Sequence, residues 1–138
     1  MTISIDTNAN TAMMTALLGL IEAGAGAGLV AFYNGTRPSP GASIGANTLV
    51  ATCAFARPCG TIDGSGFLNL DTSPTLGSVV AALMPNWARI SDSAGTFVLD
   101  CDVRATAAPD LGEELVIDAA SLSVGALLVI VSGYFTAT

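Results

Sequence analysis

Short apolar runs separated by turn residues make up most of this sequence from residue 29 onward. Gly, Pro, Asn and Asp break the chain between runs rich in Val, Ile, Leu and Phe. These breaks recur roughly every ten residues, which is the spacing typical of a β-sandwich. The pattern predicts about seven short strands in a mainly β fold. We expect a single antiparallel β-sandwich or jelly-roll-like domain, with its strands over about 29–136. The predicted strands are 29–33, 48–55, 66–70, 87–91, 96–103, 113–117 and 127–136, with 76–84 fitting either a helix or a strand.

One helix is predicted before the β region. Asp6, Thr7 and Asn8 each offer an N-cap side chain, and Gly24 stands where a glycine would end the helix. The apolar residues between them follow the i, i+3, i+4, i+7, i+8 spacing of one helix face. They are Met13, Ala16, Leu17, Leu20 and Ile21. The sequence therefore predicts a helix over about 8–23 that packs by this face, in a single domain of residues 1–138.

The clearest hairpin surrounds Asp92–Gly95. Asp at the start and Gly at the end of this segment favour a type I turn with the glycine left-handed. Counting outward from a four-residue loop pairs Ile90 with Phe97 and Ala88 with Leu99. Arg89 is then diagonal to Asp100, within reach of a cross-strand ion pair.

Charged residues are scarce. They form 11% of the 138 residues, against about 25% in a typical domain. Lysine and histidine are absent, and four arginines against eleven carboxylates give a net charge of −7. So few basic groups argue against binding nucleic acid or an anionic membrane surface. A surface this poor in charge is instead typical of a chain covered by other subunits.

Neither a membrane helix nor a secretory signal is evident. The most apolar stretch, 122–135, is shorter than the ~20 residues that a membrane helix needs. Residues 1–10 are polar and lack basic groups before an apolar run. We therefore expect a protein made in the cytoplasm.

The residues needed for common catalytic chemistry are missing. Without histidine or lysine there is no usual base to activate a Ser or Cys nucleophile. The Gly-rich segment 24–28 follows a helix, whereas a phosphate-binding loop follows a strand. The aspartates at 92, 100, 102, 110 and 118 offer oxygen ligands for calcium, but none falls in an EF-hand pattern. We therefore expect no enzyme activity, no cofactor and no metal site.

The three cysteines are open to two interpretations. Cys53, Cys59 and Cys101 are odd in number and fit no zinc-site spacing. Buried thiols that behave as small apolar side chains would explain them. A disulfide within or between subunits is the alternative.

Three blocks of the sequence form a recognisable pattern. The first joins the 13–24 helix to Tyr33-x-Gly35-Thr36-x-Pro38. The second is the hairpin Trp87-x-Arg89-Ile90-x-Asp92-Ser93-x-Gly95, and the third is the closing apolar strand. Together they resemble a family of small virion proteins encoded by tailed bacteriophages and prophages. Cys59 and Cys101 depart from the pattern, since small or glycine residues are expected there. Any role of these cysteines is therefore particular to this chain.

The resemblance implies a structural protein of the virion. The expected role is capsid decoration, as a cement protein on the capsid surface that stabilises the major capsid lattice. Expected partners are the major capsid protein and copies of the chain itself, as a dimer or trimer. Arg37, Arg57 and Arg104 are candidates for capsid or subunit contact, since loops are predicted around them. The N-terminal helix and the 36–47 loop are candidate docking elements.

Two other roles remain open. A neck, collar or tail component of the same virion would use the same sandwich to bind a ring or tube. A carbohydrate-binding β-sandwich for host attachment would instead need exposed aromatic side chains.

Overall fold

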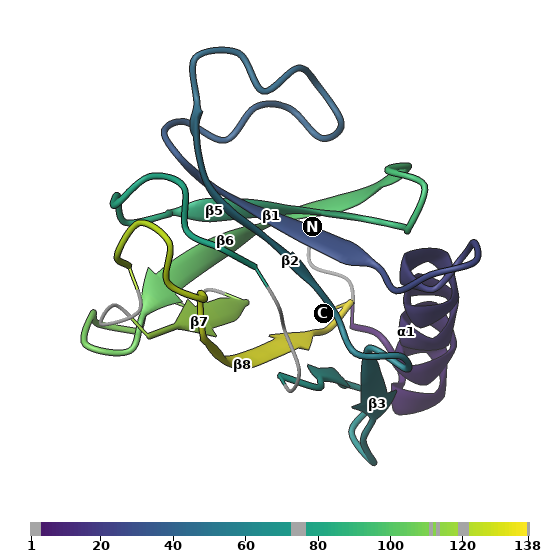
Figure 1. The fold of residues 1–138 in the computed structure, drawn as a ribbon. Helices are drawn as coiled ribbons and strands as arrows, with labels where there is room; N and C mark the ends of the chain where they lie inside the picture. The colour runs from purple at the N-terminus through teal and green to yellow at the C-terminus, as the bar shows by residue number, and fades with distance from the viewer. Residues whose placement is uncertain (1–3, 73–76, 111, 113, 119–121, 138) are drawn as a thin grey trace.

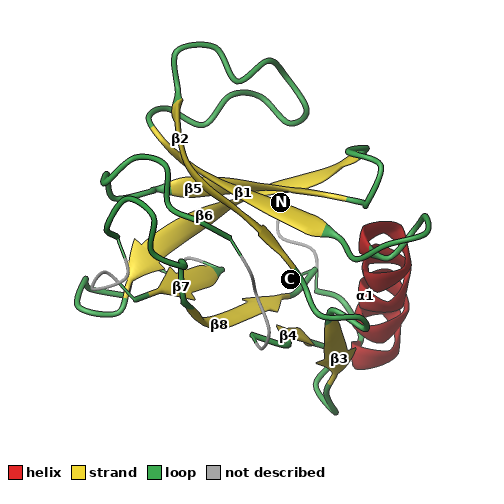
Figure 2. Cartoon of the chain, in the orientation of Figure 1, coloured by secondary structure: helices red, strands yellow, loops and turns green. Residues whose placement is uncertain are grey.

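The chain forms a curled sheet of eight strands with one helix at its N-terminal end. The computed structural model describes residues 4–72, 77–110, 112, 114–118 and 122–137. Within them the fold is mainly β with a single N-terminal helix, as the sequence predicts (Figure 1, Figure 2). The elements are α1 (Thr7–Ile21), β1 (Leu29–Asn34), β2 (Thr48–Ala54), β3 (Gly60–Ile62), β4 (Leu68–Leu70), β5 (Trp87–Ser91), β6 (Phe97–Ala105), β7 (Leu115–Ile117) and β8 (Ile130–Phe135).

The sheet is mixed rather than wholly antiparallel. Its strand order is β2-β1-β5-β6-β7-β8-β4-β3. One pair is parallel, β6 with β7, where Val103 faces Leu115 and Ala105 faces Ile117. After Ala105 the chain returns to the level of Val103 before β7 begins, so both strands run in the same direction. The expectation of an entirely antiparallel sheet is wrong at this pair.

Residues 77–80 close the curl of the sheet. They lie between the edge strand β2 and the stretch that leads into β8, through bridges of Val79 with Ala51 and of Ser78 with Leu127. The backbone N–H of Val80 donates to Val50 O at 2.8 Å on one side. The N–H of Leu128 donates to Gly77 O at 2.9 Å on the other. The segment 76–84, for which sequence allowed either a helix or a strand, is therefore bridged like a strand at 78–79; residue 76 lies outside the described part.

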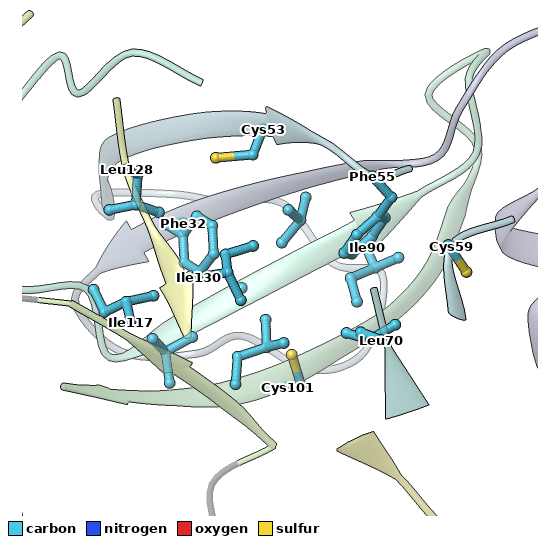
Figure 3. Packing of buried hydrophobic residues seen from close by; sticks show 14 of the residues in the cluster. Phe32, Cys53, Phe55, Cys59, Leu70, Ile90, Cys101, Ile117, Leu128 and Ile130 are labelled. Atoms are coloured by element: carbon cyan, nitrogen blue, oxygen red, sulfur yellow. The ribbon is translucent and has the colours of Figure 1, made fainter. Parts of the chain in front are cut away.

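The interior of the curl holds the hydrophobic core. Strand alternation sends every second side chain inward, and buried side chains from both halves of the sheet meet there (Figure 3). They include Phe32, Ile90, Leu115, Ile117, Leu128 and Ile130.

Helix α1 packs at one end of the sheet, but not by the predicted face. Asp6 caps it, accepting a hydrogen bond from the N–H of Asn8 at 3.1 Å. The buried residues are Asn10, Met14 and Ile21. The predicted packing face is wrong for three of its five residues, because Met13, Ala16 and Leu20 are exposed.

The rotation of the helix is set by hydrogen bonds of Asn10. Its Nδ2 donates to Thr136 Oγ1 at 3.2 Å and to Ser65 O at 3.5 Å, and its Oδ1 accepts from the N–H of Ala137 at 2.9 Å. A buried amide must find such partners. The helix is apolar over much of its circumference, so spacing alone could not select the packing face.

The β5–β6 hairpin forms with the predicted turn and a different register. Gly95 is left-handed at φ +86°, as expected. However, Ile90 pairs with Leu99 and Ala88 with Cys101. The N–H of Asp92 donates to Thr96 O at 3.0 Å, which closes the turn on residues 93–95 and shifts the pairing by one residue; an irregularity between Ile90 and Ser91 shifts it by another.

Three boundaries also differ from the predictions. Strand β3 lies partly in a segment expected to be a break, which makes eight strands instead of seven. Arg104 was expected in a loop but lies within β6. The last strand begins at Ile130, later than predicted; residue 113, the expected start of the 113–117 strand, lies outside the described part.

Closure of the sheet depends on a side chain being absent at residue 77. A Cβ at Gly77 would lie 2.1 Å from Thr52 O and 2.5 Å from Cys53 Sγ. We expect Gly77→Ala to lower the free energy of unfolding by about 1–3 kcal/mol, because the closing segment must move away from β2. Urea denaturation measures the loss. Gly64→Ala is the matched control, since nothing lies within 4 Å of its Cβ position; equal losses in the two variants would contradict this account of closure.

Candidate functional site

The loop 36–47 covers the outer face of β1 and β5 and buries the single tryptophan there. Trp87 lies on the opposite side of β5 from Ala88 and Ile90, outside the main core. Its indole Nε1 donates to Asn47 Oδ1 at 3.0 Å. The ring of Tyr33 stacks on it with centroids 4.7 Å apart. A second, smaller packed layer therefore holds this loop on the sheet.

A buried ion pair fixes the same layer. Arg89 and Asp100 face each other across β5 and β6, with Nε–Oδ1 at 2.7 Å and Nη2–Oδ2 at 2.9 Å. Their side chains are 17% and 2% exposed. The predicted Arg89–Asp100 ion pair is confirmed, but the two residues are directly opposite and not diagonal as expected. The hydrogen bonds to Asp100 raise the pKa of Arg89.

Arg89 also ties the loop to the sheet. Its Nη1 donates to Ala42 O at 2.8 Å. Its guanidinium lies 5.6 Å from the Trp87 ring centroid and 5.2 Å from that of Phe97, a cation–π arrangement. The charge of Arg89 is therefore used within the fold.

The three arginines proposed for subunit contact are all engaged within the chain. Arg37 forms an exposed ion pair with Asp102 at 3.0 Å. Arg57 donates to the carbonyl oxygens of Gly26 and Gly24, which holds the Gly-rich segment after α1. Arg104 lies 3.6 Å from Asp110. Arg37 and Arg104 both lie near the outer face of β6, because Asp102, the partner of Arg37, shares that face with Arg104.

Two open hollows lie on the described surface. One, of about 490 Å³, lies at the 36–47 loop. It is lined by Gly35, Thr36, Pro38, Ser43, Ile44, Gly45, Ala46 and Asn47. The other, of about 340 Å³, lies at the β3–β4 hairpin, with Asp71 as the charged residue in its lining. Asn47 in the loop hollow already donates to Thr36 O and Ile44 O, so its amide supports the loop.

The described residues contain no group of three His, Cys, Asp or Glu side chains placed to hold a metal ion. Within the same part of the chain, no helix is both long enough and apolar enough to cross a membrane.

All three cysteines are buried free thiols. Cys53 lies on β2, Cys59 precedes β3 and Cys101 lies on β6, and Figure 3 shows their side chains in separate parts of the core. Burial raises the pKa of Cys53 to about 11. Burial, and then the charge of Glu22, raise the pKa of Cys59 to about 12. The pKa of Cys101 is raised well above its usual value, mainly by burial. A disulfide between subunits would require one of these thiols to leave the core.

Comparison with known proteins gives no relative: no family model, curated protein or solved structure matches the chain.

Sequence reasoning missed two features of the surface. The exposed stripe of Met13, Ala16 and Leu20 on α1 was interpreted as core. Trp87 was placed in the β5 strand without its loop cover, because contact with the distant Asn47 leaves no local signal in the sequence.

We predict that loss of the buried ion pair is far more damaging than loss of an exposed one on the same strand. Asp100→Asn leaves the Arg89 charge buried without its partner and should lower the free energy of unfolding by about 2–4 kcal/mol. The control Asp102→Asn removes the partner of the exposed Arg37 and should cost less than about 1 kcal/mol. Urea denaturation of both variants tests this, and comparable losses would overturn the assigned role of Arg89.

The thiols should react slowly in the folded protein and destabilise it at high pH. A thiol whose pKa is raised by folding contributes its full stability below its unfolded pKa of about 8.5. That contribution decreases as pH rises toward the folded values, by at most about 1.4 kcal/mol per pH unit and thiol. We expect Cys53→Val to reduce the fall in unfolding free energy between about pH 8 and pH 10.

An aromatic disulfide reagent at about pH 8 should modify the cysteines only after denaturation; rapid labelling of the folded chain would contradict their burial.

Proposed function

We propose that this chain is a structural protein of a tailed-phage virion, acting as a capsid decoration (cement) protein that binds and stabilises the major capsid lattice. The exposed apolar face of α1 is the observation that carries the proposal. Met13 is 48% exposed and Leu20 57% exposed, with the exposed Ala16 between them. No charged residue lies within Thr7–Ile21.

This face has the character of a docking surface. An adjacent face of the same helix, roughly 100° around its axis, packs on the sheet through Met14 and Ile21, so α1 is held firmly while Met13 and Leu20 remain uncovered. An apolar patch held on a rigid element is typical of a protein contact. Helix α1 is therefore favoured over the 36–47 loop as the element that meets the capsid.

The arginines have a secondary place in the proposal. Arg37, Arg57 and Arg104 all bind groups of their own chain. Contact of Arg37 with a capsid carboxylate would exchange one exposed ion pair for another, which changes the free energy little. We therefore place the binding energy in the apolar contact.

The other two roles make different use of the molecule. A neck, collar or tail component would use the same helix face, and copy number separates it from a head protein. Hundreds of copies per particle indicate the head lattice, and about six to twelve indicate a ring at the neck or tail. Carbohydrate binding would depend on exposed aromatic rings; Trp87 is buried, whereas Tyr134 and Phe97 are 44% and 38% exposed. Binding on a glycan array would favour that role.

The helix face gives the test. Undecorated heads of the phage that encodes the chain are mixed with purified protein, and binding is followed by co-sedimentation and by the melting temperature of the heads. Wild-type protein should bind and raise that temperature. Leu20→Asp should weaken binding about tenfold or more, because it buries an unpaired charge in the contact.

The control is Thr15→Asp, which adds the same charge at another exposed position of the same helix. It should bind like the wild-type chain. Absence of wild-type binding, or equal loss in both variants, would contradict the proposed contact.

A further inference from the structure

Two charge-free stretches of the chain meet on one surface. Residues 72–88 and 119–138 contain no Asp, Glu or Arg. The Ser78–Leu127 bridge joins their described parts. So do hydrogen bonds from Val79 N to Ala126 O at 2.9 Å and from Gly125 N to Val79 O at 2.8 Å. In Figure 1 the teal segment after residue 77 and the yellow-green segment before β8 lie beside each other at the left.

Strand alternation turns large apolar side chains outward there. Val79 and Leu128 point into the core and are buried, so their neighbours point away from it. The exposed set, which we name the apolar seam, is Val80 (58% exposed), Val124 (67%), Leu127 (56%) and Val129 (47%).

The seam is large enough for a protein contact. Leu83 and Val131 are also exposed and belong to the same two charge-free stretches. Together these six side chains present on the order of 500 Å² of apolar surface, at the upper end for a patch on a monomer. Two such faces in contact would bury about 1,000 Å², the size at which specific interfaces begin.

We propose that the apolar seam is the contact between two copies of this chain, related by a two-fold axis. A face without charge is compatible with a second copy as its occupant. Each copy carries −7, so two copies repel wherever acidic groups meet, and a charge-free face lets them approach. A two-fold contact needs only this one self-complementary surface.

One acidic residue lies at the border of the seam. The N–H of Asp118 donates to Val129 O at 3.0 Å, which places this residue beside Val129. A carboxylate there can stay in the solvated rim of an interface whose centre is apolar. The inference rests on the proposed function only in treating the chain as an assembling subunit, and its test needs no virion.

Leu127 and Leu20 form a matched pair for that test, because they are equally exposed, at 56% and 57%, and lie on different surfaces. Sedimentation equilibrium of the full chain should show a wild-type dimer. Leu127→Asp should raise the dimer dissociation constant about tenfold or more, and Leu20→Asp should leave it unchanged. Val124→Asp, in a turn where the added charge is easily tolerated by the fold, should act like Leu127→Asp. Circular dichroism and thermal melting establish that the variants fold.

Salt gives an independent readout. Raising ionic strength from about 0.01 M to about 1 M shortens the screening length from about 30 Å to about 3 Å, so repulsion between like-charged copies falls and the dimer should tighten. A wild-type monomer, a trimer, a dimer lost in Leu20→Asp but kept in Leu127→Asp, or a dimer that weakens with salt would each overturn the proposal. Capsid binding that fails while the dimer forms would count against the proposed function alone.

Discussion

Closure of the sheet by residues 77–80 is the constraint on which the rest of the structure depends. The backbone at Gly77 approaches β2 so closely that no side chain fits between them. With the curl closed, Val79 and Leu128 complete the core. The same alternation sends Val80 and Leu127 outward. The interior and the apolar seam are therefore two consequences of one set of backbone hydrogen bonds.

Local signals predicted the parts of the fold that depend on near neighbours. The mainly β class, the left-handed Gly95 and the Arg89–Asp100 pair all follow from turn chemistry and alternation. The register of the β5–β6 hairpin could not be predicted, because a three-residue loop in place of the expected four and one irregularity shift the pairing without a clear sequence signal. The closing role of residues 77–80 depends on contacts with Ala51 and Leu127, which are distant in sequence.

The candidate contact residues show the same division. The sequence shows where the arginines are but not which carboxylates they meet. Arg37 and Arg104 are therefore predicted to contact another subunit, whereas each lies beside a carboxylate of its own chain. On α1, apolar residues extend around most of the helix, and the hydrogen bonds of Asn10 with Thr136 and Ala137 decide which side is buried. The choice of face is made by the C-terminal end of the chain, far from the helix in sequence.

The fold thus leaves two uncovered apolar surfaces in different places. Figure 1 shows α1 at the right and the segments of the apolar seam at the left, so the two do not overlap. A dimer formed through the seam would present two copies of the Met13–Leu20 face to a repeating lattice. Once the first copy is bound, the second binds as an intramolecular step, so a modest contact per helix becomes strong overall.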